Sequence, residues 1–177
     1  ALALGLAHVL ISEKLYDESF IKSNTDLPFL VRMDTLKLLK PQDIISGYQP
    51  KKLKKTQLLK EGEKPPPPLK QDRQVVTEKL REEWGDFVVW NLDSNSTEVL
   101  CRDDHGLERN FALQGSFNVD TLDGKQVSVR PVFDLLKEHS SYFTPEVVSD
   151  LCHVNQESVV WLAREMAKNK EKTLVPV

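Results

Sequence analysis

The stretch NTDLPFLVRMDT, Asn24–Thr35, decides how the N-terminal part of this chain folds. Its middle holds Pro28, which lacks a backbone N–H and keeps the preceding Leu27 in an extended conformation. Thr25 and Asp26 stand just before, and their side chains can bond nearby backbone amides, which favours turns over regular elements. The stretch therefore predicts an extended segment with polar tips. Ordinary packing does not explain such a segment, which raises the question of what it binds.

The composition is that of a globular chain. It has 177 residues, of which 40% are hydrophobic and 29% charged, enough for one ordinary domain. A formal net charge of −3 gives no overall attraction to nucleic acid or anionic lipid. Cys101 and Cys152 form no disulfide framework, and we interpret them as buried thiols.

Helices are predicted before the stretch. ALALGLAHVLI has no basic region before it and is too short to cross a bilayer, so it predicts a core-packed helix over Leu2–Glu13. Asp17 is placed to cap a short helix, ESFIKS. The chain starts within a pattern, and its last residues, KTLVPV, resemble a strand that stops early. Both ends suggest a piece of something larger.

We divide the chain into a helical part with the polar stretch (1–45), a Pro- and Lys-rich excursion (46–84), β-rich hairpins (85–130) and a helical part ending in a strand (131–177). The excursion contains KKLKKTQLLKEGEKPPPPLK, with seven lysines, two glutamates and four consecutive prolines that favour polyproline II. Its irregular part is either a solvated loop or a contact to another subunit. Only Tyr48 interleaves with the lysines, so nucleic-acid binding is not supported.

Two hairpins are predicted in the third part. DFVVWNLDSNSTEVLC indicates strands over Phe87–Trp90 and Thr97–Cys101, joined by the polar turn DSNS. LDGK is a second hairpin turn, and beyond it Val127 and Val129 alternate with polar residues as in a half-buried strand.

The fourth part has clear helix starts. Pro131 suits the first turn of a helix, Thr144 and Pro145 suit an N-cap and its following position, and Asn155 opens the last helix. That last helix carries an apolar stripe, which predicts core packing: Val159, Leu162, Ala163 and Met166.

Catalytic motifs are missing from the sequence. It has no GxGxxG, Walker loop, GxSxG or HExxH, and its histidines at 8, 105, 139 and 153 are scattered. Composition and spacing alone give an α/β chain, with helices flanking short strands and hairpins, whose function is open.

Three runs of residues resemble a known family. The run LAHVLISEKLYDESFIKSNTDLPFLVRMDT and the later runs RPVFDLLKEHSSYFTPEVVSDLCHV and ESVVWLAREMAKNK are similar to catalytic subunits of molybdenum-bis(pyranopterin guanine dinucleotide) oxidoreductases. TDLPFLVR is most similar to the branch of the dimethyl sulfoxide reductase superfamily with nitrate reductase, nitrite oxidoreductase and the type II enzymes. Between 46 and 114 the likeness is loose and rests on WGDFVVW.

The resemblance implies an internal portion of a large multidomain fold. In this family the metal-ligating aspartate and the cysteines of the iron–sulfur clusters lie upstream of the matching segment. The resemblance therefore implies no catalytic residue and no metal ligand in this chain. The iron–sulfur (4Fe-4S) clusters belong to the parent enzyme.

The resemblance also implies a use for the polar stretch. The long anionic cofactor needs hydrogen-bond donors and acceptors from irregular backbone, and the residues in position to supply them are Thr25, Asp26, Arg32, Asp34 and Thr35. The alternative from the residues alone is that Asp26 caps a turn and Arg32 pairs with Asp34.

The implied activity is oxygen-atom transfer or hydroxylation at molybdenum, with electrons passing through iron–sulfur clusters, most similar to nitrate reductase or nitrite oxidoreductase. The implied partners are the rest of the catalytic subunit, an iron–sulfur electron-transfer subunit, a haem-containing or membrane-anchor subunit, and a small oxyanion or other small substrate. A membrane-associated complex on the periplasmic side is favoured. The alternative is a non-catalytic interaction module that docks a partner through its basic Pro-rich loop.

Overall fold

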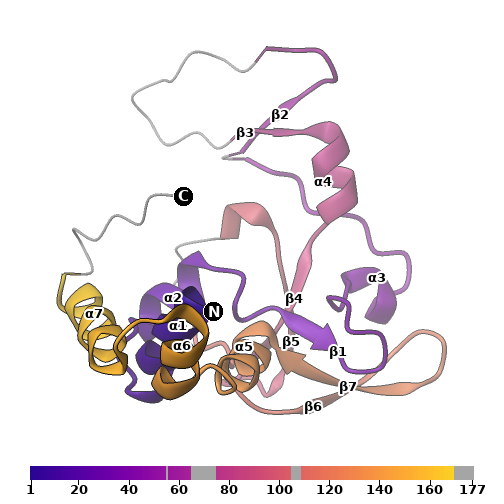
Figure 1. Ribbon diagram of the computed structural model, residues 1–177. Helices are drawn as coiled ribbons and strands as arrows, with labels where there is room; N and C mark the ends of the chain where they lie inside the picture. Colours follow the sequence, from indigo (N-terminus) through magenta and orange to yellow (C-terminus); the bar gives the residue numbers. More distant parts are fainter. Residues whose placement is uncertain (55, 65–74, 105–108, 170–177) are drawn as a thin grey trace. The chain divides into compact units, whose positions relative to one another are not determined.

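The structure is a computed structural model that describes residues 1–54, 56–64, 75–104 and 109–169 (Figure 1). Helices and short strands in small sheets confirm the predicted α/β class. The chain forms two compact units, one of Ala1–Ile21 with the chain from Phe133 onward, the other of Lys22–Val132. The proline run at 65–68, the segment at 172–177 that was predicted to be a strand, and the segment around His105 lie outside the described residues. The division into four parts stays a prediction.

The first unit is helical. Its elements are α1 (Leu2–Ser12), the first half of α2 (Glu18–Asn24), most of α5 (Val132–Ser140), α6 (Pro145–Cys152) and α7 (Gln156–Lys168). No helix in the described ranges combines the length and the apolar character needed to cross a bilayer.

The helices begin where the sequence predicts. The carboxylate of Asp17 accepts a hydrogen bond from the Phe20 N–H at 3.0 Å, and the Thr144 hydroxyl accepts one from the N–H of Val147 at 3.4 Å. The side-chain oxygen of Asn155 accepts a hydrogen bond from the N–H of Glu157, in the first turn of α7, at 2.7 Å. Each side chain satisfies a backbone donor that has no partner within its helix. Pro131 is a correction, because it ends strand β7 and α5 starts one residue later.

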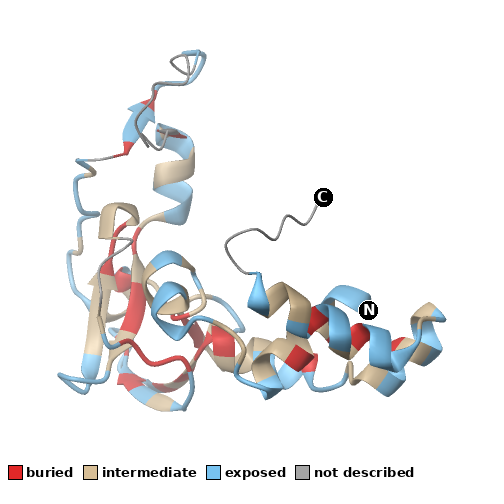
Figure 2. Cartoon of the chain, turned by 90° about the vertical axis from the view of Figure 1, so that its left-hand side faces the viewer, coloured by how far each residue is buried: buried red, intermediate tan, exposed pale blue. Residues whose placement is uncertain are grey.

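The core of the first unit is formed by Phe133 together with small and branched side chains. Figure 2 shows buried residues on the helices of this unit. The buried side chains include Val9, Phe133, Val148, Val159 and Ala163. The predicted stripe on the last helix is narrower than expected, because Leu162 is 37% exposed and Met166 is half-buried. At the rim, the guanidinium of Arg164 donates two hydrogen bonds of 2.9 Å to the carboxylate of Glu13, joining α7 to α1.

Helix α1 approaches α6 closely at Gly5. A Cβ at this position would lie 2.5 Å from the Cγ2 of Val148, which is fully buried and stiff about χ1. We expect Gly5→Ala to destabilise α1 by up to about 2 kcal/mol, since overpacking costs about 1–3 kcal/mol and the gain in helix propensity offsets about 1 kcal/mol of that cost. Hydrogen exchange of the α1 amides in the intact subunit measures this.

The control for that prediction is the same change in a Val148→Ala background, which removes the clashing methyl group. There Gly5→Ala should be neutral or stabilising. Equal destabilisation in both backgrounds would contradict the close approach as the cause.

The second unit is built on short antiparallel sheets. One sheet has the order β1-β7-β6, and a separate hairpin pairs β4 with β5. The strands are β1 (Leu30–Arg32), β4 (Phe87–Asn91), β5 (Ser96–Leu100), β6 (Phe117–Asp120) and β7 (Gln126–Pro131), with the short helices α3 (Pro41–Ile44) and η1 (Arg102–Asp104) beside them.

Both predicted hairpins are confirmed. The turn after β4 contains Asn95 at φ 49°, and the turn LDGK contains Gly124 at φ 79°, a backbone conformation that glycine adopts without strain. Beyond it, Val127 and Val129 face the core beneath both sheets, as their alternation predicts. Figure 2 shows buried residues along these strands.

The excursion has more regular structure than predicted. Strand β2 (Gln57–Leu59) pairs in parallel with β3 (Val75–Thr77), and α4 (Glu78–Trp84) follows directly. The hydroxyl of Thr77 caps α4 by accepting a hydrogen bond from the Leu80 N–H at 3.2 Å. Strand β2 lies within the stretch predicted to be an irregular loop, and this is a correction to that prediction.

Candidate functional site

The polar stretch forms a turn that leads into β1. The hydroxyl of Thr25 accepts a hydrogen bond from the Leu27 N–H at 3.3 Å, and the carbonyl of Asp26 accepts one from the Phe29 N–H at 3.0 Å. Pro28 is fully buried, and β1 begins two residues later at Leu30. The predicted polar tip is present as a turn, but the extended part is shorter than predicted, because it is limited to Phe29 and strand β1 and residues 33–35 form a second turn.

This turn borders a pocket of about 260 Å³ within the second unit. The end of α2 and the turn supply one side, and the rest of the lining comes from β4, the end of β5, η1 and the residues Cys101 and Phe111. The lining residues are Lys22, Ser23, Asn24, Thr25, Asp26, Pro28, Phe29, Phe87, Leu100, Cys101, Arg102, Asp104 and Phe111.

One wall of the pocket is aromatic. The rings of Phe29 and Phe87 stack with centroids 4.3 Å apart and planes 7° apart. The ammonium of Lys40 lies 5.0 Å from the centroid of Phe87, a cation–π distance. A flat ring system could lie against such a wall with little loss of solvation.

The polar side of the pocket carries opposite charges. Lys22 and Arg102 bring cations to the lining, and Asp26 and Asp104 bring carboxylates. Asp26 is exposed, and within the described ranges its carboxylate accepts no hydrogen bond and forms no ion pair. It is therefore available for N–H donors of a ligand.

Arg32, Asp34 and Thr35 lie away from this pocket. The guanidinium of Arg32 donates two hydrogen bonds to the Asp34 carboxylate, at 3.1 and 2.9 Å, and its Nη1 lies 3.6 Å from the carboxylate of Asp43. The Arg32 hydrogen bonds lower the pKa of Asp34, and the same contact raises the pKa of Arg32. Thr35 is exposed. The alternative pairing of Arg32 with Asp34 is thus present, and a cofactor role for these three residues stays a prediction.

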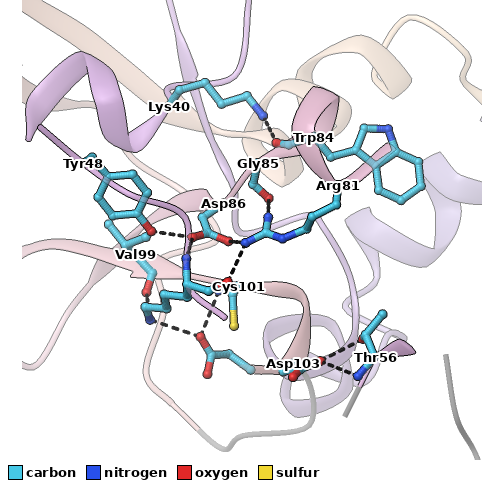
Figure 3. Close-up of polar contacts among 12 residues, drawn as sticks. Lys40, Tyr48, Thr56, Arg81, Trp84, Gly85, Asp86, Val99, Cys101 and Asp103 are labelled. Carbon is cyan, nitrogen blue, oxygen red and sulfur yellow. Dashed lines mark hydrogen bonds and ion pairs between the residues drawn. The ribbon is translucent and has the colours of Figure 1, made fainter. Parts of the chain in front are cut away.

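A buried carboxylate holds the excursion against β4. Asp86 is fully buried and accepts hydrogen bonds from the Tyr48 hydroxyl, from the Lys51 backbone N–H at 2.8 Å and from the Arg81 guanidinium at 2.7 Å (Figure 3). Arg81 also donates to the carbonyls of Gly85 and Lys51. Burial and the hydrogen bond to Asp86 raise the pKa of Tyr48. Sequence reasoning missed this cluster, because nothing local pairs Asp86 with residue 48 or 51.

Two further aspartates hold the same part of the chain. Asp103 accepts hydrogen bonds from the backbone N–H groups of Lys54 and Thr56, the latter at 3.0 Å, and from the Thr56 hydroxyl at 2.8 Å. Asp104 lies 3.2 Å from the Lys51 ammonium. We call Tyr48, Lys51, Lys54 and Thr56 the docked segment.

Cys101 lies where the pocket meets η1. It is buried, as predicted, and burial raises the pKa of its thiol. Cys152 is only half-buried, which corrects the prediction for that residue. Among the described side chains, no group of three or more His, Cys, Asp and Glu is placed to hold a metal ion.

The relatives of this chain are oxidoreductase subunits. Perchlorate reductase subunit alpha of Dechloromonas aromatica (strain RCB) is 33% identical over 184 residues, which cover 99% of this chain and 18% of that protein. Respiratory nitrate reductase subunit alpha of Haloferax mediterranei is 30% identical, covering 99% of this chain and 16% of that protein. Dimethylsulfide dehydrogenase subunit alpha of Rhodovulum sulfidophilum is 48% identical over 46 residues, which cover 26% of this chain and 5% of that protein.

These relatives are catalytic subunits of molybdopterin oxidoreductases, and the chain is homologous to part of a dimethyl sulfoxide reductase family protein. The resemblance found in the sequence is thereby confirmed. The chain spans less than a fifth of the length of the first two relatives. No protein-family model matches it.

Proposed function

We propose that this chain is part of the catalytic subunit of a molybdenum oxidoreductase of the nitrate reductase or nitrite oxidoreductase type. The observation that carries the proposal is the turn at Thr25 and Asp26, which borders a pocket and presents an available carboxylate. Two oxyanion reductase alpha subunits match nearly the whole chain and so support the choice of substrate class.

The pocket fits one end of the proposed bis(pyranopterin guanine dinucleotide) cofactor. Its volume of about 260 Å³ is below the roughly 300–1,000 Å³ of sites that enclose a whole drug-sized ligand. It therefore suits a single ring system, such as a pterin or guanine, stacked against Phe29 and Phe87. The N–H groups on the edge of that ring would donate to the carboxylate of Asp26, and the remainder of the cofactor would lie against other parts of the subunit.

This chain's share of the reaction is binding and orientation. The molybdenum cofactor, when bound, supplies the oxygen-atom transfer or hydroxylation chemistry. Asp26 and the Thr25 turn would fix one ring edge, and the buried Pro28 keeps the turn rigid against β1. The electrons would leave through iron–sulfur clusters held elsewhere in the enzyme, toward an electron-transfer subunit and a haem-containing or membrane-anchor subunit.

The test of this proposal is Asp26→Ala in the intact enzyme. We expect cofactor affinity to fall about 10- to 100-fold, because a hydrogen bond to a charged group contributes about 1.5–3 kcal/mol. Thermal stability of the cofactor-free subunit should stay unchanged, since no described residue depends on this carboxylate. The measurement is molybdenum per subunit by elemental mass spectrometry, together with the guanine nucleotide released by acid hydrolysis.

The matched control is Asp150→Ala, an exposed aspartate of α6 that lies outside the pocket lining. It should leave the molybdenum content at the wild-type level. Wild-type molybdenum and guanine in Asp26→Ala would remove Asp26 from the cofactor site.

A second candidate function is an interaction module without catalysis. It is favoured by the exposed lysines of the excursion, among them Lys52, Lys54, Lys60 and Lys64. The same metal analysis separates the two candidates. An intact, folded preparation from the native source without molybdenum or tungsten would favour the interaction module.

A further inference from the structure

The 3-10 helix η1 contributes to the wall of the pocket and also contacts the excursion. Arg102 and Asp104 line the pocket, and all three η1 residues contact the excursion. The Arg102 guanidinium lies 5.4 Å from the ring centroid of Trp84 at the end of α4, and Asp104 meets the ammonium of Lys51. Asp103, between them, holds the docked segment (Figure 3).

Asp103 makes the strongest of these contacts. Its carboxylate accepts three hydrogen bonds from two residues of the docked segment, and one of these residues, Thr56, is 7% exposed. Hydrogen bonds to an ionised carboxylate are stronger than those between neutral groups. If Asp103 were removed, the amide and hydroxyl of Thr56 would lose their acceptor in a place that water reaches poorly.

Asp104, on the pocket side of η1, is held within the turn itself. Asp104 accepts a hydrogen bond from the Cys101 N–H at 2.9 Å, and its own N–H donates to the Cys101 carbonyl at 3.0 Å. These contacts close the turn upon itself. Its attachment to the excursion includes the three hydrogen bonds of Asp103, the contact of Arg102 with Trp84, and the ion pair of Asp104 with the partly exposed ammonium of Lys51.

We propose that Asp103 is a positioning residue for the pocket: by holding Lys54 and Thr56, it fixes the turn that places Cys101, Arg102 and Asp104 in the pocket wall. The proposal deepens the proposed function, because it names a residue outside the pocket that determines the pocket's form. It also couples the docked segment to the pocket.

Coupling of this kind is reciprocal. A partner protein that displaces the docked segment loosens the wall, and a ligand in the pocket makes the docked segment harder to displace. The exposed lysines of the excursion favour a partner with an acidic surface.

The test uses the thiol of Cys101 as a reporter of the wall, in the full-length subunit with its partner subunits. Alkylation by iodoacetamide is followed by peptide mass spectrometry, which separates Cys101 from the half-buried Cys152. We expect Asp103→Ala to raise the alkylation rate of Cys101 about tenfold or more, on the scale of a lost charged hydrogen bond. The rate at Cys152 should not change.

Two variants complete the test. Asp103→Asn keeps an acceptor oxygen for Thr56 and should restore most of the protection of Cys101. Glu83→Ala removes an exposed acid of α4 that forms no hydrogen bond or ion pair with the described residues, and it should behave as wild type. An unchanged Cys101 rate in Asp103→Ala would overturn the proposal, and so would an equal rise at both cysteines, since that reports general unfolding.

This readout does not depend on the cofactor. Faster alkylation of Cys101 in Asp103→Ala, together with normal molybdenum content in Asp26→Ala, would retain the positioning role of Asp103 and reject the cofactor site at Asp26. Loss of molybdenum in Asp26→Ala, with an unchanged Cys101 alkylation rate in Asp103→Ala, would retain the cofactor site and reject the positioning role.

Discussion

Asp86→Ala should destabilise the attachment of the excursion by about 3–5 kcal/mol, the usual cost of removing one partner from a buried ion pair. The Arg81 guanidinium, whose side chain is 11% exposed, would lose its carboxylate, and the Tyr48 hydroxyl and the Lys51 N–H would lose their acceptor. Hydrogen exchange of the amides of α4 and of Lys51, in the intact subunit, measures the change. Protection there should fall much more than in the helices of the first unit.

Two further variants identify the cause. Asp120→Ala removes an exposed aspartate whose carboxylate accepts a hydrogen bond from Gln126, and it should change protection little. Replacing Asp86 and Arg81 together by leucine should be far milder than Asp86→Ala, because the double change leaves no unpaired buried charge. If the double variant were as unstable as Asp86→Ala, the loss of stability would come from altered packing and not from an unpaired buried charge.

Phe133→Ala should destabilise the first unit by about 3–5 kcal/mol, the range for truncating a fully buried aromatic side chain. The ring is 1% exposed and meets Tyr16 edge to face, with centroids 5.1 Å apart. Its loss leaves a cavity beside the start of α5. Hydrogen exchange of α1 and α5 should therefore increase, while the β4–β5 hairpin keeps its protection.

Phe20→Ala is the matched control, since this phenylalanine of α2 is 58% exposed. Its truncation should cost less than about 0.5 kcal/mol, as for surface changes in general. If both phenylalanine variants had equal effects, burial would not be the source of the stability lost at Phe133.

Features of the fold with a local cause could be predicted from the sequence. Asp17, Thr144 and Asn155 each cap a helix through a side-chain oxygen that satisfies an amide two or three residues away. The turns DSNS and LDGK likewise act within a few residues, and both hairpins follow from them. In these places the interacting atoms are close in the sequence, so their spacing carries the information.

Features that join distant parts of the chain could not be predicted. The pairing of β1 with β7 brings Val31 opposite Arg130, and the acceptors of Asp86 meet donors more than thirty residues away. Leu162 fits the helical period yet remains 37% exposed. For the candidate site, the residue types of Thr25 and Asp26 pointed to a polar turn, whereas the pocket wall depends on Cys101 and Arg102, whose positions only tertiary packing determines.

The first unit is discontinuous in the chain, and this has a consequence for biosynthesis. Helix α1 packs with α6 and α7, but residues 22–132 are made between them. At about 5–20 residues per second, the ribosome needs roughly 6–22 s for that stretch. During this time Val9 and the other apolar residues of α1 have no helical partner from α6 or α7, so nascent α1 is an expected substrate for chaperones, and slower translation of the second unit should increase its aggregation.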